Sequence, residues 1–391
     1  MKTKLTVTPI SWLPAFLLAG LLFLMTPLPV QADEYTGPLE FPAPLCLPDV
    51  YLYDPQDCLP LGAAQTLTDL AREGIHYPPR PMAYSRTPWD YGTVEYLYAR
   101  VLTEGPINIY GSLESAISKS PARVMPDGMR VFSYSQRAES EGQVYYRFKS
   151  GEWVWGGDVS RITAPRYEGM VFHETPRDDF IFVNSIEFPG YTAPAYSAPQ
   201  SGNVFRRYDI LPLYGTQEDS AGTLWYRVGV NDWLPEHTVA AVMINTTPPE
   251  GVDNNRWIEL NLFEQTMMVY ENGELVFATL VSTGVEPYYT QPGLFQIYQR
   301  KEAEDMTISV ESEFYYLEDV PYTQYFDQAR AFHGIYWHQF LGYVRSRGCV
   351  NLSIADARWL WEWAQDGDWV YVWDPSGMTP TDPALYTGGG P

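Results

Sequence analysis

Residues 333–352 read HGIYWHQFLGYVRSRGCVNL, and this stretch decides how the rest of the chain is interpreted. A cysteine, Cys349, directly follows Gly348, and a histidine, His333, stands sixteen residues upstream of it. Thiol acyl transfer needs a thiolate, a base that makes it, and donors for the developing oxyanion. Cys349 fits the nucleophile, and His333 fits the base because its pKa lies naturally near working pH. Gly348 lets backbone N–H groups approach a substrate carbonyl, and the charge of Arg347 would favour the thiolate.

Three other interpretations of these residues stay open at this point. Free cysteines are among the most buried residues, so Cys349 could be purely structural. A metal site made of His333, His338 and Cys349 is a second alternative, although no HExxH or CxxC spacing supports it. A glycosidase would need paired acids, and one charged stretch of the chain holds a cluster of them, namely Glu302, Glu304 and Asp305. Gly-rich phosphate-binding loops are absent from the sequence.

The sequence on both sides of the cysteine predicts a mainly β unit. The dipeptide Asn272-Gly273 is a strong signal for a two-residue hairpin. Ser353 and Asp356 form a capping box that opens a helix through Ala364. Short runs of alternating or β-forming residues predict four strands, at 257–263, 266–270, 275–281 and 369–373. We therefore predict a β-rich C-terminal domain over residues 256–375 with at least one helix.

An internal repeat precedes this domain. Residues 142–153 read GQVYYRFKSGEW and residues 222–233 read GTLWYRVGVNDW, so a glycine, a tyrosine, an arginine and a tryptophan recur at a fixed offset. Short aromatic and polar runs broken by Gly, Pro, Asn and Asp predict two small antiparallel barrels or sandwiches. They resemble bacterial SH3-like domains, placed at 89–165 and 166–245, with a linker over 246–255. Their aromatic residues either form a binding surface or fill cores, and small barrels favour core filling.

The N-terminal residues predict an exported protein. Residues 1–32 combine two early lysines, an apolar stretch and a small-residue cleavage site, as a signal peptide does. The apolar stretch is short and interrupted by proline, so no membrane span is expected after cleavage, although an uncleaved anchor is the alternative. The predicted location is the cell envelope or the extracellular space. In the Pro-rich segment 33–88, Cys46 and Cys58 could form a disulfide, which leaves Cys349 as the odd thiol.

Net charge narrows the range of partners. The chain carries 48 acidic and 25 basic residues, a net charge of −23 that becomes −25 once the two lysines of the signal are removed. Such an acidic surface argues against nucleic acid or an anionic bilayer as the partner. No cofactor is expected, and the oligomeric state is open. Residues 376–391 are predicted to form a flexible tail.

The C-terminal pattern resembles the catalytic domain of the L,D-transpeptidase family, in which an upstream His-Gly precedes a Ser-His-Gly-Cys block. In this chain those positions are His333-Gly334 and the SRGC block at 346–349, and the similarity extends over residues 256–375. The resemblance implies a β-rich fold and a ping-pong reaction on peptidoglycan stem peptides. Cys349 would attack the bond between the diamino acid and the terminal D-Ala, and an amine of a neighbouring stem would resolve the thioester as a cross-link.

The resemblance also implies roles for single residues. The Gly334 carbonyl would orient the His333 imidazole, and backbone N–H groups around Gly348 and Cys349 would form the oxyanion hole. Substrate contacts are expected from six residues: Arg347, Ser346, Asn351, His338, Trp337 and Tyr316. Arg347 stands where the family pattern has His, which spares the base but puts the pocket charge and the choice of acyl acceptor in doubt.

Two further functions stay open on the sequence. The same thioester could end in water, which would make the protein an L,D-carboxypeptidase or a cross-link-cleaving peptidase. A non-catalytic wall-binding scaffold would instead use the repeats. The intact His333, Gly348, Cys349 and Asn351 speak against a decayed catalytic domain.

Overall fold

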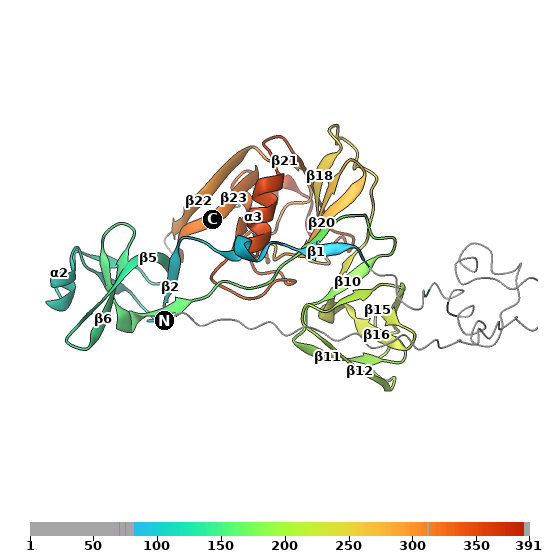
Figure 1. Ribbon diagram of the computed structural model, residues 1–391, viewed down its shortest axis with the longest axis horizontal. Coiled ribbons are helices and arrows are strands. Elements are labelled where there is room, and N and C mark those ends of the chain that lie inside the picture. The colour runs from blue at the N-terminus through green and yellow to red at the C-terminus, as the bar shows by residue number, and fades with distance from the viewer. Residues whose placement is uncertain (1–69, 71–74, 76–81, 311–312, 387–391) are drawn as a thin grey trace, which may run out of the picture.

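A computed structural model describes residues 70, 75, 82–310 and 313–386. The predicted signal peptide, the Cys46–Cys58 disulfide and almost all of the Pro-rich segment before residue 82 lie outside the described residues. Strands dominate the described part, which has two α-helices, and this confirms the mainly β fold class. Figure 1 shows two small β bodies, around β5 and around β15, beside a C-terminal unit that contains α3.

The C-terminal unit contains a seven-stranded sheet. Asn272 and Gly273 join two of its strands with φ values of 53° and 81°, as the predicted two-residue hairpin requires. In sheet order the strands are β1 (Tyr84–Arg86), β9 (Met170–Phe172), β20 (Glu274–Leu280), β19 (Thr266–Glu271), β18 (Arg256–Asn261), β26 (Trp369–Trp373) and β21 (Gly293–Gln296). Because β1 and β9 precede residue 256, the sheet extends beyond the boundary predicted for this domain.

A second group of strands in the C-terminal unit carries the predicted catalytic residues. It consists of β22 (Gln299–Val310), β23 (Glu313–Asp327), β24 (Arg330–Gly334) and β25 (Val350–Leu352). Apolar side chains of these strands, of the seven-stranded sheet and of helix α3 (Ile354–Trp363) share one core, which includes Ile258, Leu260, Met267, Phe277, Phe326, Phe332, Val350, Leu352 and Leu360. Burying apolar surface from three elements in one cluster fixes the strand that follows Cys349 against the rest of the unit.

Helix α3 begins and ends where the sequence predicts. The Ser353 hydroxyl accepts a hydrogen bond from the Asp356 backbone N–H at 3.1 Å, which satisfies one of the free donors of the first turn. The Asp356 carboxylate does not complete the capping box. It accepts instead from Gly169 N at 2.8 Å, from Thr279 Oγ1 at 2.6 Å and from Thr87 Oγ1 at 3.3 Å. Asp356 therefore ties the helix to β20 and to two segments outside the predicted domain.

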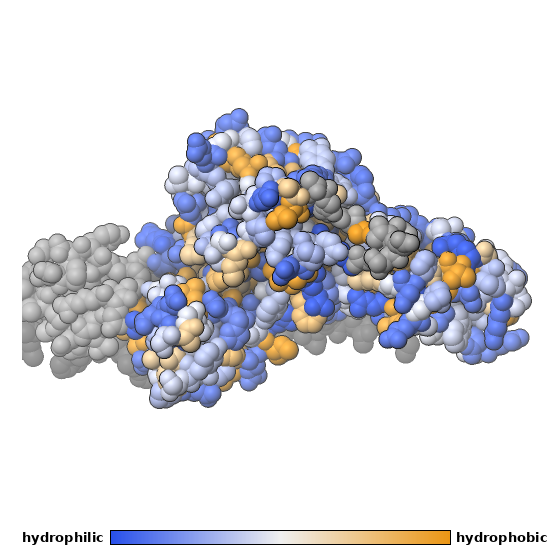
Figure 2. Space-filling view, turned by 180° about the vertical axis from the view of Figure 1, so that it is seen from behind, coloured by the Kyte–Doolittle hydropathy of each residue, from blue (hydrophilic) through white to orange (hydrophobic). Residues whose placement is uncertain are grey.

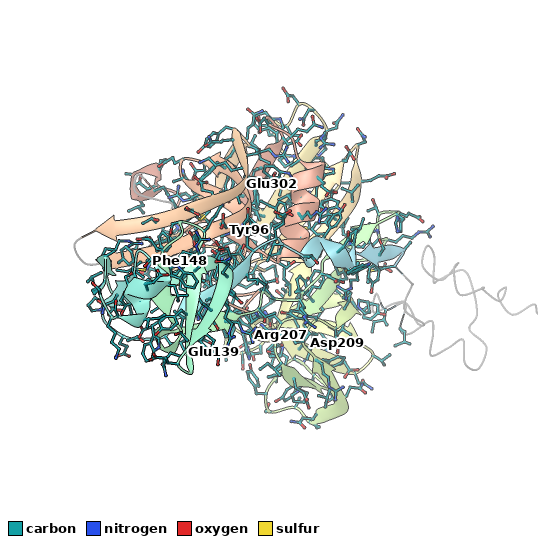
Figure 3. All side chains as sticks on the ribbon, turned by 60° about the vertical axis from the view of Figure 1, so that its left-hand side comes forward. Tyr96, Glu139, Phe148, Arg207, Asp209 and Glu302 are labelled. Carbon is teal, nitrogen blue, oxygen red and sulfur yellow. The ribbon has the colours of Figure 1, made fainter. Side chains whose placement is uncertain are left out.

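The first β unit (residues 97–162) contains a short helix and seven strands. In chain order its elements are β2 (Leu97–Val101), β3 (Ile107–Ile109), α2 (Leu113–Ile117), β4 (Arg123–Met125), β5 (Met129–Ser140), β6 (Gln143–Phe148), β7 (Trp153–Trp155), the 3-10 helix η2 (Gly156–Asp158) and β8 (Val159–Ile162). Its buried core includes Phe132, Tyr146 and Phe148, and Phe314 of β23 packs against it. Figure 3 shows Phe148 inside this unit.

The second β unit (residues 180–242) repeats part of this order. Its elements are β10 (Phe180–Val183), β11 (Glu187–Tyr191), β12 (Gln200–Arg206), β13 (Ile210–Pro212), β14 (Gly215–Glu218), β15 (Leu224–Gly229), β16 (Asp232–Pro235), η3 (Glu236–Thr238) and β17 (Val239–Val242). The elements η3 and β17 follow η2 and β8 at the offset of the sequence repeat. Trp225 and Tyr226 are fully buried, which agrees with aromatic residues filling cores. The resemblance to SH3-like domains stays a prediction.

The first β unit is joined to the C-terminal unit by the pairing of one strand from each. Strand β23 pairs in parallel with β5, with Tyr315 opposite Met129 and Leu317 opposite Val131. Next to this pairing, the Ser133 hydroxyl donates to the Asp319 carboxylate at 2.5 Å. The first β unit is thus an extension of the sheet that carries β24 and β25.

Side-chain hydrogen bonds dock the second β unit. The buried Glu264 carboxylate accepts from the Tyr226 hydroxyl at 2.5 Å and from Ala241 N at 2.7 Å. The Thr266 hydroxyl donates to Ala241 O at 3.1 Å. A buried hydrogen-bonding group that lost these partners would be left unsatisfied at a cost in free energy, so this contact fixes the second unit against the loop after β18.

Two short 3-10 helices lie near the ends of the described chain. Helix η1 (Trp89–Gly92) packs on α3, and η4 (Pro383–Tyr386) ends with Tyr386, which is buried and whose carbonyl accepts from Arg330 Nη2 at 3.0 Å. Within the predicted tail, Tyr386 therefore packs on the protein, whereas residues 381–385 before it are exposed. None of the described helices has the length and apolar character needed to cross a membrane. On the face shown in Figure 2, hydrophilic residues are widespread and hydrophobic ones form small patches.

Candidate active site

Strand register brings the cysteine and the histidine to one face of the sheet. β24 and β25 are parallel neighbours with Phe332 opposite Val350 and His333 opposite Asn351. Side chains alternate between the two faces of a strand. Cys349, directly before β25, therefore projects to the same face as His333 and Asn351. Two adjacent strands thus bring Cys349 and His333 together, although they are sixteen residues apart in the sequence.

The turn before Cys349 has a conformation that glycine favours. Gly348 has a φ of +107°, and a Cβ at this position would lie 3.1 Å from Arg330 Nε. The Ser346 hydroxyl donates to Cys349 O at 2.5 Å and accepts from Gly348 N at 3.1 Å. The Thr290 hydroxyl donates to Gly348 O at 2.8 Å. The backbone on both sides of the cysteine is therefore held by side-chain hydroxyls, and the Gly348 N–H, an expected oxyanion donor, is already paired with Ser346.

Arg330, the first residue of β24, supports this turn. Its guanidinium is buried, pairs with the Asp327 carboxylate at 2.7 Å and donates to Tyr386 O at 3.0 Å. Its Nε donates to Tyr289 O at 3.3 Å. A buried arginine whose three side-chain nitrogens each donate to a fixed acceptor has little freedom to move. Arg330 is therefore a rigid support for Gly348.

Burial keeps both reacting groups neutral before substrate arrives. Desolvation raises the pKa of the Cys349 thiol to about 11, against smaller opposing effects of the Ala331 backbone and Arg330. Desolvation also lowers the pKa of His333 to about 4, although a hydrogen bond to the Gly334 carbonyl favours the charged ring. His333 Nδ1 lies 3.4 Å from that carbonyl oxygen, and Cys349 Sγ lies 3.8 Å from Ala329 O. At neutral pH the resting site therefore holds a protonated Cys349 thiol and a neutral His333 ring that can accept a proton.

Most of the predicted site residues line one cavity of about 630 Å³. They are Cys349, His333, Asn351, Arg347, Ser346, His338 and Trp337. Gly334 and Gly348 belong to the strand end and the turn that shape it. The cavity is large enough for a peptide segment rather than a single small group.

Two of these residues are fixed by contacts inside the cavity. The ring of Trp337 lies 5.5 Å from that of His333, centroid to centroid. His338 accepts from Phe340 N at Nδ1, at 3.2 Å, and its Nε2 lies 2.9 Å from the side-chain nitrogen of Asn351. Burial lowers the pKa of His338 to about 3, helped by the charges of Arg345 and Arg100. His338 is therefore a neutral polar group in the wall of the cavity.

The structure does not bring Tyr316 into this cavity. Tyr316 packs against the core of the first β unit, and its neighbour Tyr315 lines the cavity in its place. Adjacent residues on a strand face opposite sides, so an error of one position on β23 exchanges the two tyrosines. The guanidinium of Arg347 lies 5.4 Å from the Tyr315 ring centroid.

Two residues of the first β unit also line the cavity and were not foreseen from the sequence. They are Arg100 of β2 and Met129 of β5. No local pattern marks them, because they reach the site only through the pairing of β5 with β23. The repeat placed both residues in a separate predicted domain, and nothing in their local sequence links them to Cys349.

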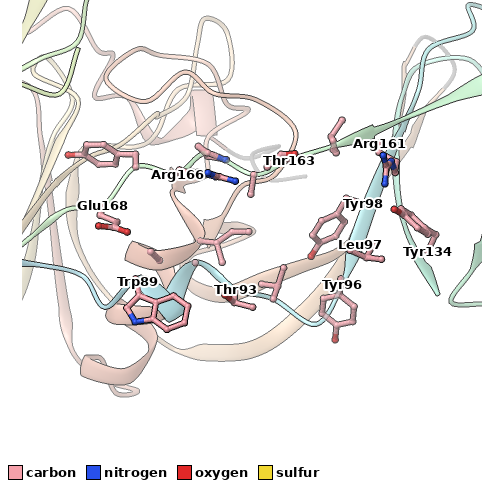
Figure 4. Close-up of a pocket in the computed structure, with 18 of the residues that line it drawn as sticks. Trp89, Thr93, Tyr96, Leu97, Tyr98, Tyr134, Arg161, Thr163, Arg166 and Glu168 are labelled. Atoms are coloured by element: carbon pink, nitrogen blue, oxygen red, sulfur yellow. The ribbon is translucent and has the colours of Figure 1, made fainter. Parts of the chain in front are cut away.

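The metal and glycosidase interpretations can be compared with the described residues. No group of three potential metal-ligating side chains occurs in that part of the chain. Glu304 of the acidic cluster pairs with Lys301 and accepts from the Tyr325 hydroxyl at 2.6 Å, and it does not line the Cys349 cavity. A larger cavity of about 1010 Å³ lies beside β2 and η1, lined by residues such as Trp89, Tyr96 and Arg166 (Figure 4), and contains no cysteine or histidine.

Comparisons with known proteins find similarity in the segment that holds the site. Residues 255–372 match the L,D-transpeptidase catalytic domain, YkuD. A search of curated proteins finds no match. Among similar solved structures, an L,D-transpeptidase from Stackebrandtia nassauensis is 29% identical, with 33% of this chain and 58% of that chain covered and a TM-score of 0.26.

Two further solved structures are similar over different lengths. The catalytic domain of an Enterococcus faecium L,D-transpeptidase is 22% identical, with coverage of 32% of this chain and 100% of that one and a TM-score of 0.28. An L,D-transpeptidase from Mycobacterium smegmatis is 18% identical, with coverage of 54% and 93% and a TM-score of 0.29. This chain spans little more than half the length of the Stackebrandtia protein.

Proposed function

We propose that this chain, whose residues 255–372 belong to the L,D-transpeptidase catalytic domain family, is an exported cysteine acyltransferase that cross-links peptidoglycan stem peptides. The observation that carries the proposal is the placement of Cys349 and His333 on one face of adjacent strands, in one cavity, inside the matched segment. The apolar N-terminal segment supports export to the cell envelope.

The first half-reaction is acylation of Cys349. The thiol sulfur attacks the carbonyl carbon of the bond between the diamino acid and the terminal D-Ala, while the neutral His333 takes the thiol proton. The C–N bond then breaks, His333 returns the proton to the leaving amine, and D-Ala departs. A thioester remains between the stem peptide and Cys349. The backbone N–H of Cys349 is the proposed donor to the developing oxyanion.

The second half-reaction transfers the acyl group. A side-chain amine of another stem peptide attacks the thioester carbonyl, and His333 accepts a proton from that amine. The C–S bond breaks, the proton returns to sulfur, and an amide cross-link is released. The Gly334 carbonyl, 3.4 Å from His333 Nδ1, holds the ring with its other nitrogen available for both transfers.

Mass spectrometry of a purified tetrapeptide stem incubated with the mature protein tests this function. The wild-type protein should release D-Ala and form a cross-linked dimer, and an intact-mass adduct should map to Cys349. The Cys349→Ser variant should do neither, because a hydroxyl in a site that desolvates its nucleophile is far harder to deprotonate than a thiol. Release of D-Ala by Cys349→Ser at the wild-type rate would refute the proposal, and release without a dimer would mark a carboxypeptidase.

A further inference from the structure

The Cys349 cavity concentrates positive charge in a strongly acidic protein. Three arginines line it, namely Arg100, Arg345 and Arg347. The lining carboxylate is that of Glu286, which is exposed. The chain as a whole has almost twice as many acidic as basic residues, so this excess of arginine is opposite to the composition of the protein.

Arg100 reaches the cavity from the first β unit. It lies on β2 and is half-buried, and its Nη2 donates to the carbonyl oxygen of Trp337. Its Nε is buried without a hydrogen-bond partner among the described residues. A buried donor without a partner costs free energy that a bound acceptor would recover. One guanidinium nitrogen is thus bound to the backbone, and another, Nε, has no partner.

One face of the Arg345 guanidinium is covered by an aromatic ring. The Cζ atom of Arg345 lies 4.4 Å from the centroid of the Phe340 ring, and its backbone N–H donates to Thr283 O at 2.8 Å. Stacking occupies the face of a guanidinium. The N–H groups in the plane of the guanidinium are not used by this contact and keep the fork geometry that binds carboxylates with two hydrogen bonds.

The two guanidinium groups are close enough to repel each other. Burial lowers the pKa of Arg100, and the charge of Arg345 lowers it further. The same two charges act on the neighbouring His338. Within the described part of the chain, no ion pair joins a carboxylate to either arginine, whereas Arg330 pairs with one carboxylate and Arg256 with two. A like-charged pair without a counter-ion is relieved by an anionic ligand.

We propose that Arg100 and Arg345 together bind a carboxylate of the peptide substrate in the Cys349 cavity. The ligand class, a peptide carrying a free carboxylate near the acylated carbonyl, rests on the proposed function, whereas the presence of an anion site does not. Stem peptides contain such groups at the terminal D-Ala and on the amino acids before it. The site would select peptides by the position of that charge.

This assignment makes the first β unit part of the substrate site. Arg100 is separated from the catalytic segment by most of the chain, and it is placed by the pairing of β2 with β5 and of β5 with β23. A specificity residue supplied by a neighbouring unit lets substrate preference change without altering Cys349 or His333.

The first experiment tests the anion site without using the enzymatic reaction. Cys349 is alkylated with iodoacetate, which is anionic, and with iodoacetamide, which is neutral and of similar size. The rate with iodoacetate divided by the rate with iodoacetamide should be roughly three- to tenfold lower in the Arg100→Gln/Arg345→Gln double variant than in the wild type. Arg100→Lys should keep most of the wild-type ratio. Arg137→Gln, which removes an exposed arginine of β5 outside the cavity, is the matched control and should leave the ratio unchanged.

The second experiment identifies the carboxylate. Tetrapeptide stems amidated at one carboxylate at a time are compared with the parent peptide for acylation of Cys349. The double variant should lose roughly 10- to 100-fold in acylation rate on the parent peptide. It should match the wild type on the peptide whose bound carboxylate has been amidated, and that peptide names the source of the charge.

The outcomes separate this inference from the proposed function. An unchanged alkylation ratio in the double variant overturns the anion site, even if transpeptidation is found. A changed ratio supports it, even if the protein does not acylate on stem peptides. An equal loss on the parent and on every amidated peptide would show a general structural defect and would overturn the assignment of a peptide carboxylate.

Discussion

The substitution Asp356→Asn offers a direct test of how the catalytic unit is held together. Asp356 is fully buried and accepts hydrogen bonds from Gly169, Thr279 and Thr87. Desolvation raises the pKa of its carboxyl group from 3.8 to about 6, against those hydrogen bonds. The folded state therefore binds this proton more tightly than the unfolded state does. The contribution of Asp356 to stability is greatest at low pH and falls as pH rises from about 3.8 to about 6.

The size of the effect follows from the shift. Each pKa unit corresponds to about 1.36 kcal/mol, so a shift of about 2 units amounts to about 3 kcal/mol over the whole window. The protein has a pI near 4.5, and low net charge favours precipitation, so measurements belong above pH 5. About 1.4 kcal/mol of the loss falls between pH 5 and pH 8, which is a tenfold change in the unfolding constant.

Guanidinium denaturation of the mature wild type and the Asp356→Asn variant at both pH values measures this quantity. The free energy of unfolding of the wild type minus that of the variant should be about 1.4 kcal/mol smaller at pH 8 than at pH 5. The exposed substitution Gln365→Ala, which removes no titratable group, serves as the control and should show the same difference at both pH values. A constant difference for Asp356→Asn would mean that this carboxyl group is not desolvated by helix α3 and β20, and the packing argument would fail.

Two further predictions concern the active site. His333→Ala should lower the acylation rate roughly 10²- to 10⁴-fold, while the control substitution of the exposed His173 by Ala should not. Because the pKa of His333 is about 4, the wild-type acylation rate should stay flat from pH 5 to 8. A midpoint near pH 6.5 in that profile would contradict a buried, neutral base. Gly348→Ala should slow acylation of Cys349 and destabilise the protein by about 1–3 kcal/mol, because the new side chain would combine a positive φ with a close contact to Arg330. Gly105→Ala, also at positive φ but with open space around it, measures the backbone cost alone. Equal losses of thermal stability in the two variants would exclude a contribution from the Arg330 contact.

Local patterns in the sequence predicted the local structure of the C-terminal unit. The alternation after Trp257, the Asn272-Gly273 turn and the Ser353 cap each depend on neighbouring residues alone. For this reason the hairpin β19–β20 and helix α3 lie where they were expected. The neighbourhood of Cys349 and His333 in one cavity was likewise expected, from the family resemblance.

Long-range pairing was outside the reach of these patterns. Strand β9 joins β20, and β5 joins β23, although each comes from a different predicted domain. A strand carries no local mark of its distant partner. Tyr316 shows the same limit on a smaller scale, because a register irregularity between Glu304 and Met306 affects which tyrosine of β23 faces the site.

The pairing of β23 with β5 also bears on how the chain folds. During synthesis, residues 129–131 emerge long before residues 315–317, which form their edge partner, and such distant pairings are slow to form. Until then an edge of β5 is open to other strands, a known hazard for aggregation. The first β unit would therefore complete its folding only after β23 has been synthesised. A version of this unit placed in another protein would have to include the β22–β23 hairpin.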